Sequence, residues 1–144
     1  MPSIEVAPEY GYVVLAVVAH EFVLMFGAGL VMSARDKYGV KYPNLYASKA
    51  ETKEAEKFNC VQRGHQNTLE NVPMFLAFAL LGGLQHPLAC AVGAMLYNFG
   101  KALYMYGYSL GDPNKRHLGA VAYVGLCTVM GSTIKLGLSL AGII

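Results

Sequence analysis

The sequence has few charged residues and long stretches without any. Only 14% of its 144 residues are Asp, Glu, Lys or Arg, whereas 55% are hydrophobic, and the mean hydropathy is +0.39. A soluble domain of this length carries more charge on its surface. The formal net charge is only +2, so the chain has no strongly basic surface and nucleic acid is not an expected partner. The composition favours a protein that lies in a membrane.

Motifs of several common function classes are also absent. No GxGxxG or P-loop pattern is present for a nucleotide. Cys60, Cys90 and Cys127 are widely spaced and form no CxxC pair, which excludes a zinc ribbon and gives no disulfide framework. No metal site is expected. Repeats, low-complexity stretches and linkers are missing as well, so the whole chain, residues 1–144, is expected to form a single domain.

What the sequence does contain is four long apolar runs. They are Tyr12–Met32, Thr68–Leu84, Leu88–Leu110 and Leu118–Ile144. About 20 apolar residues in a helix span the hydrocarbon core, and backbone amides in lipid must be paired within the segment. The second run is long enough only if its helix begins earlier, near Phe58. The sequence therefore predicts an all-α integral membrane protein built as a four-helix bundle. The four transmembrane helices are expected over about 12–32, 60–84, 88–110 and 118–141.

The orientation of these helices is predicted from the cations. Of the eleven Lys and Arg residues, seven lie between the first two runs, in residues 35–63, and Lys115 and Arg116 lie between the last two. Loops rich in Lys and Arg face the cytosol, which places both connections there and both termini on the other side. The first run is not expected to be a cleavable signal peptide, because no basic residue precedes it and its apolar part is too long.

Two polar stripes interrupt the second and third runs. In "FNCVQRGHQNTLENVP", residues 58–73, Arg63, Asn67 and Glu70 share one face of a helix at about 100° per residue. A second stripe of one amine and three phenols lies on the third run. Its members are Tyr97, Lys101, Tyr104 and Tyr108.

Ionisable groups inside a membrane are costly and usually face a partner or a wet cavity. The two stripes are therefore expected to face each other or a neighbouring subunit, and to offer cations, amides and hydroxyls to an anionic polar ligand near the cytosolic surface. Simpler interpretations stay open. Arg63 can snorkel to lipid phosphates, Tyr108 can belong to an aromatic belt, and Arg63 with Glu70 can be a structural ion pair.

Three stretches together resemble one protein family. "FNCVQRGHQNTLENVP", "YMYGYSLGDPNKR" and "SARDKYGVKYP" are similar to motifs of the MAPEG family of microsomal glutathione-dependent enzymes, especially its microsomal glutathione S-transferase 3 branch. The similarity runs from about Glu9 to about Gly137. It implies a four-helix subunit that forms a homotrimer in the endoplasmic reticulum membrane, with glutathione bound between adjacent subunits and the active site toward the cytosol.

The resemblance also implies which residues contact glutathione. The RxxxNxxE motif of the family corresponds to Arg63, Asn67 and Glu70, and the Tyr-x-x-x-Tyr pair of the next helix corresponds to Tyr104 and Tyr108. Three further positions match residues that hold glutathione in the family. They are Arg35, His65 and Lys101. Two positions depart from the family pattern, since Asp36 replaces an arginine and Asn71 replaces a tyrosine.

By the same resemblance Arg116 activates the glutathione thiol, with Lys115 as the alternate and Tyr104 as a hydrogen-bond donor to sulfur. The nucleophile is the thiolate, which a nearby guanidinium stabilises. The implied function is a transferase or peroxidase that joins glutathione to lipophilic electrophiles, with leukotriene C4 synthase-like activity in this range, or reduces lipid hydroperoxides. Two alternatives stay open: a non-catalytic lipid-binding scaffold like the 5-lipoxygenase-activating protein, and a small transporter or channel subunit.

Overall fold

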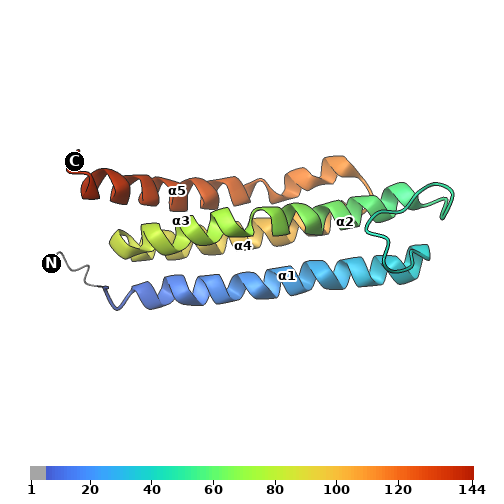
Figure 1. Ribbon diagram of the computed structural model, residues 1–144, viewed down its shortest axis with the longest axis horizontal. Helices are drawn as coiled ribbons and strands as arrows, with labels where there is room; N and C mark the ends of the chain where they lie inside the picture. Colours follow the sequence, from blue (N-terminus) through green and yellow to red (C-terminus); the bar gives the residue numbers. More distant parts are fainter. Residues whose placement is uncertain (1–5) are drawn as a thin grey trace.

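The computed structural model describes residues 6–144, which contain helices and no strand. Figure 1 shows long helices lying side by side. The α-helices are α1 (Tyr10–Tyr38), α2 (Ala55–Glu70), α3 (Val72–Gln85), α4 (Pro87–Ser109) and α5 (Val121–Leu140), and a 3-10 helix, η1 (Pro113–Gly119), precedes α5. The all-α prediction is confirmed for the described residues.

Local sequence sets where the helices end. α1 stops at Gly39, whose φ of 71° is left-handed and is adopted readily only by glycine. α4 begins with Pro87. The N–H groups of the first helical turn have no partner within the helix, so the absence of an N–H in proline costs no hydrogen bond there. At the start of η1, the Asp112 carboxylate accepts a hydrogen bond from the Asn114 N–H at 2.9 Å, which is the usual N-cap arrangement.

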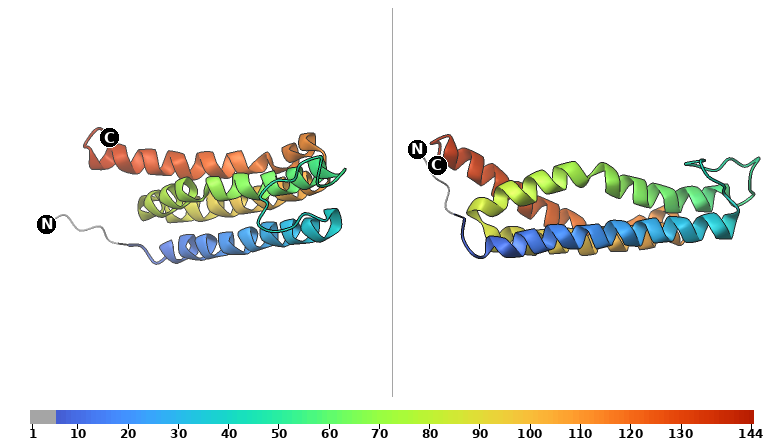
Figure 2. Two further views of the ribbon diagram at one scale, coloured as in Figure 1. Left: turned by 45° about the vertical axis from the view of Figure 1, so that its right-hand side comes forward. Right: turned by 60° about the horizontal axis from the view of Figure 1, so that its bottom comes forward.

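The segment predicted as one span over 60–84 forms two helices. α2 already begins at Ala55, and it is separated from α3 by Asn71. Pro73 explains the break, because proline lacks the N–H that a continuous helix needs and its ring crowds the preceding turn. The Asn71 side chain donates to the Asn67 carbonyl at 2.7 Å, so a carbonyl near the end of α2 keeps a partner. Figure 2 shows the chain changing direction between α2 and α3.

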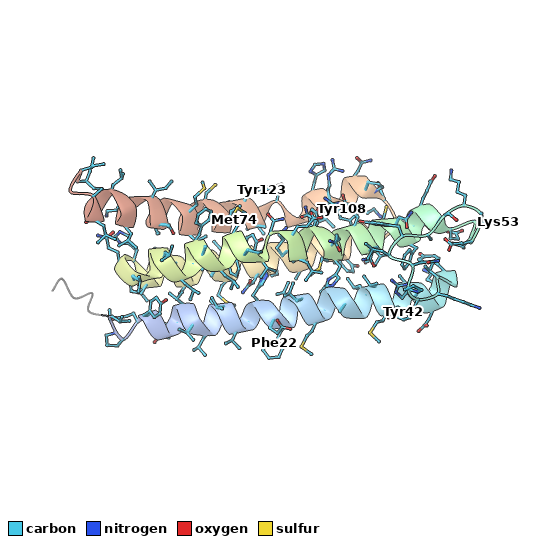
Figure 3. All side chains as sticks on the ribbon, viewed as in Figure 1. Phe22, Tyr42, Lys53, Met74, Tyr108 and Tyr123 are labelled. Carbon is cyan, nitrogen blue, oxygen red and sulfur yellow. The ribbon has the colours of Figure 1, made fainter. Side chains whose placement is uncertain are left out.

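Two helices in the described residues, α1 and α5, are long and apolar enough to cross a membrane. α4 is not among them, because Asn98, Lys101 and several tyrosines lower its hydropathy. Many large apolar side chains on α1 and α5 are exposed, including Phe22 at 67% and Tyr123 at 71%, and Figure 3 shows Phe22 directed away from the other helices. Such surfaces suit lipid rather than water.

The interior of the bundle contains a small polar network. His20 of α1 is buried, and its Nδ1 lies 2.8 Å from Asn98 Oδ1 on α4. The Asn98 amide donates in turn to the Ala16 carbonyl at 2.8 Å. Phe75 and Tyr97 stack beside this network with ring centroids 4.4 Å apart. These contacts hold α1 and α3 against α4 next to the second polar stripe.

The two connections rich in cations lie at the same end of the molecule. Figure 1 shows the loop between α1 and α2 at the end where α4 also turns into η1, while the start of α1 and the end of α5 lie at the other end. The polar stripes of α2 and α4 are therefore brought to the end that carries most of the positive charge.

Candidate functional site

A pocket of about 210 Å³ lies where α2, α4, η1 and α5 meet. Four residues predicted from the sequence line it: Arg63 from α2, Tyr104 and Tyr108 from α4, and Arg116 from η1. Figure 3 shows Tyr108 and Tyr123 in this part of the molecule. The remaining residues that line the pocket are His117, Gly119, Ala120 and Tyr123.

A second pocket of about 140 Å³ adjoins the first and shares Tyr104, Gly119 and Tyr123 with it. Lys101 lies on its wall with only 7% of its surface exposed. The ammonium of Lys101 donates to Asn67 Oδ1 at 3.0 Å, which joins the stripe of α4 to that of α2. The prediction that the two stripes face each other is therefore confirmed at this contact.

The electrostatics of the two pockets come mainly from cations. Arg63 pairs with Glu70 at 2.8 Å, and their side chains are 44% and 45% exposed. In the first pocket, the Tyr104 and Tyr108 rings meet edge to face at 5.0 Å, and the Lys101 ammonium lies 4.9 Å from the Tyr104 ring centroid. Arg63 and Arg116 thus line the first pocket and Lys101 lines the second, while Glu70 is paired with Arg63.

Two close backbone approaches seat η1 beside α4. A Cβ on Gly107 would collide with the Lys115 carbonyl oxygen, and one on Gly119 would lie 2.6 Å from the Gly100 carbonyl oxygen. Only glycine permits these approaches. Because the Lys115 backbone is directed at α4, the next residue, Arg116, lines the pocket and Lys115 does not.

Three predicted residues line neither pocket: Glu70, which pairs with Arg63, and Arg35 and His65. Arg35 is buried at the end of α1, where its guanidinium donates to the Asn44 carbonyl at 2.9 Å and lies 4.3 Å from the Tyr42 ring centroid. His65 points toward α1, since a Cβ on Gly27 would lie 2.6 Å from its Nδ1. His65 is about 200° around α2 from Arg63, which separates it from the first pocket within one chain.

Sequence reasoning missed several residues that share these walls. A wider cleft of about 600 Å³ beside the first pocket shares Arg63 and Tyr108 with it and reaches Tyr46 in the loop after α1. The helical spacing of the two stripes does not predict these residues, because they lie on other segments. They are Tyr46 in a loop, His117 in η1 and Tyr123 in α5. The other residues on the wall of the cleft are Glu56, Asn59, Cys60, Gly111 and Pro113.

The loop near this cleft carries exposed ion pairs. Lys49 and Glu56 meet at 2.8 Å, and the hydrogen bond from Lys49 lowers the pKa of the Glu56 carboxyl. Both side chains are fully solvated, so water screens the pair and it adds little stability.

The model of the MAPEG family matches residues 13–134, which include every residue of the two pockets. The chain belongs to the MAPEG family. The family resemblance predicted from the three sequence motifs is confirmed. MAPEG proteins are membrane proteins of the glutathione-transferase and eicosanoid-related kind, and the family includes transferases and peroxidases as well as members without enzymatic activity. Its members typically use glutathione.

The residues present fit glutathione by their chemistry. Glutathione carries two carboxylates, one ammonium and one thiol. The two pockets offer three cations for the carboxylates and the thiolate, and Glu70 beside them for the ammonium. Charge-assisted hydrogen bonds of this kind give orientation as well as affinity.

Proposed function

We propose that this MAPEG protein is a membrane-bound glutathione transferase and peroxidase. The observation that carries the proposal is the gathering of Arg63, Tyr104, Tyr108 and Arg116 around one pocket, beside the Lys101–Asn67 contact. A scaffold that only binds lipid has no use for two guanidinium groups and two phenols on the wall of one small pocket.

In the proposed mechanism the tripeptide is held by charge. Arg63, Lys101 and the Tyr108 hydroxyl bind its carboxylates, Asn67 adds an amide contact, and Glu70 binds its ammonium. On ligand binding, Arg63 and Glu70 then replace part of their contact with each other by contacts with the ligand. When the tripeptide is bound in this way, the cysteine of glutathione lies near Arg116 and Tyr104.

Arg116 has the central chemical role. Its guanidinium stabilises the thiolate over the thiol, stays charged at any working pH and does not compete as a base. Tyr104 donates its hydroxyl hydrogen to the sulfur. The thiolate then adds to an electrophilic carbon, forming a conjugate, or attacks the terminal oxygen of a lipid hydroperoxide. Preorganised donors of this type lower the barrier because they are in place before charge develops.

Arg35 and His65 enter the proposal through a neighbouring copy. Arg35 lies at the end of α1 and His65 lies against Gly27 of α1, so neither lines the first pocket of its own chain, and we propose that they contact glutathione bound between two subunits. This division of the predicted residues supports a homotrimer with the site between adjacent subunits. In such an assembly each subunit has four transmembrane segments. They are α1, the pair α2 and α3 taken together, α4, and α5.

The lipophilic substrate is proposed to arrive from the membrane. Tyr123 is exposed and lines both pockets, so the outer face of α5 leads from lipid to the reactive thiolate. This arrangement brings a water-soluble co-substrate and a lipid-soluble electrophile together at the interface. We place the site at the cytosolic face of the endoplasmic reticulum membrane.

One observation favours the scaffold as a second candidate. An entirely apolar groove of about 830 Å³ runs between α1 and α4, away from the polar pockets, and it suits an acyl chain. Its lining residues are Tyr12, Leu15, Ala16, Ala19, Leu88, Ala91, Val92, Met95, Leu96 and Phe99.

Glutathione binding separates the two candidates. We expect the detergent-purified protein to bind glutathione in a calorimetric titration and to develop thiolate absorbance at the ultraviolet edge on mixing. S-Methylglutathione, which has no S–H, is expected to bind without that absorbance. Binding of neither compound, together with binding of a fatty acid, would favour the scaffold.

The cytosolic position of the site is tested by topology. In sealed microsomes, added protease is expected to cut the loop between Lys49 and Lys57 and to spare tags on both termini, because cation-rich loops face the cytosol. Immunoblotting against each tag measures the result. Removal of the N-terminal tag from intact vesicles would reverse the proposed orientation.

A further inference from the structure

His117 follows Arg116 in η1 and lines the same pocket. Its side chain is exposed rather than packed in the core. Its backbone is held, because its carbonyl accepts a hydrogen bond from the Ala120 N–H at 3.1 Å and Gly119 seats η1 against α4. His117 therefore shares one pocket wall with the residues proposed to bind the thiol.

Forming a thiolate releases a proton, and neither Arg116, which stays charged, nor Tyr104, which donates a hydrogen bond, takes it. The other ionisable side chains on the pocket wall are two arginines and three tyrosines. Guanidinium groups and phenols already hold their protons at neutral pH and do not accept another. Imidazole is the side chain whose charge changes between about pH 5 and 8.

The other charged and titratable groups around His117 are not suited to accept the thiol proton. Arg63 faces the pocket from α2, Tyr104 and Tyr108 from α4, Tyr123 from α5, and Arg116 from η1. Glu70 of α2 is paired with Arg63 at 2.8 Å and does not line this pocket. Lys115 and Asp112 lie on the same connection and do not line the pocket.

We infer that His117 is the catalytic acid–base of this site. The inference rests on the proposed function, since it needs glutathione in the pocket. The imidazole takes the proton of the S–H bond as that bond breaks, and the electron pair stays on sulfur next to Arg116. When the thiolate adds to a carbon–carbon double bond conjugated to a carbonyl, an S–C bond forms and the imidazolium returns the proton to the resulting enolate.

The same proton serves the peroxidase reaction. The thiolate attacks the terminal oxygen of a hydroperoxide, an S–O bond forms and the O–O bond breaks, and the imidazolium protonates the departing alkoxide to give the alcohol. Sulfur is oxidised and the peroxide is reduced. A second glutathione then attacks the glutathione sulfenic acid and yields the disulfide and water.

The fate of the proton can be measured with the unmodified protein. Thiolate absorbance and proton release to a pH indicator are followed together on mixing with glutathione, and S-methylglutathione corrects for protons from other groups. In the wild type, proton release to solvent is expected to keep pace with the thiolate absorbance, because the imidazole takes the S–H proton and passes it on.

His117→Gln removes the base and keeps a polar side chain of similar size. The rate of thiolate formation is expected to fall about 10²-fold, while the amount of thiolate formed at equilibrium changes little. In His117→Ala, added imidazole should restore the rate. His86→Gln makes the same change at the turn between α3 and α4, outside both pockets, and should leave the kinetics unchanged.

The possible failures are distinguishable. An unaltered rate of thiolate formation in His117→Gln, or no rescue of His117→Ala by added imidazole, would overturn the role of His117 while leaving the proposed function standing. Absence of thiolate in the wild type would overturn both.

Discussion

Replacing Arg116 by alanine is expected to lower turnover with a lipophilic electrophile by about 10²–10³-fold, the usual loss when one preorganised electrostatic stabiliser is removed. Glutathione affinity should change far less, because Arg63 and Lys101 are proposed to hold the carboxylates. The pKa of the bound thiol should rise, since the cation that favours the anion is gone. Thiolate absorbance followed against pH measures this shift.

Lys115→Ala is the matched control for this prediction. Only the Lys115 carbonyl packs against Gly107, and alanine keeps that carbonyl, so η1 should stay in place and both assays should match the wild type. An inactive Lys115→Ala beside a normal Arg116→Ala would exchange the two roles. Small effects in both would leave Tyr104 as the group that activates sulfur.

Removing one anchor of the tripeptide should weaken binding rather than turnover at saturation. Arg63→Ala and Asn67→Ala are each expected to raise the Kd for glutathione about 10- to 100-fold, because one hydrogen bond to a charged group contributes about 1.5–3 kcal/mol. Arg63→Ala also frees Glu70 from its ion pair, and Asn67→Ala deprives the buried Lys101 ammonium of its acceptor. Calorimetric titration measures both affinities.

Lys57→Ala serves as the control for these two variants. Lys57 lies on α2 like Arg63, but it pairs with Glu54 at 2.6 Å and lines neither pocket. It should bind glutathione as the wild type does. Circular dichroism melting checks that each variant is folded. Normal affinity in both Arg63→Ala and Asn67→Ala would mean that the polar stripe of α2 is structural.

The sequence predicted where helices form, but it did not predict that the second span is divided into α2 and α3 at Asn71. Apolar runs fix where helices form in a membrane protein, because unpaired backbone amides are too costly in lipid. The break at Asn71 depends on one proline, and proline in a membrane helix can either kink it or end it. The local pattern did not decide between these outcomes, and the contact from Asn71 to Asn67 accompanies the break that formed.

The sequence by itself determined the family, the all-α class and the two polar stripes. Their spacing put Arg63, Asn67 and Glu70 on one face of α2, since helical periodicity depends only on residue number. It also offered Arg116 and Lys115 as alternates without geometric grounds for choosing. Both lie in a connection, where residue number no longer fixes direction.

The tertiary structure decided which of these residues meet. The seating of η1 on Gly107 and Gly119 turns Arg116 toward the pocket and leaves Lys115 outside it. The same packing adds His117 and Tyr123 to the wall and separates Arg35 and His65 from it. The physical reason is that these contacts join segments far apart in the chain, where close backbone approach and side-chain volume, rather than periodicity, set what each residue faces.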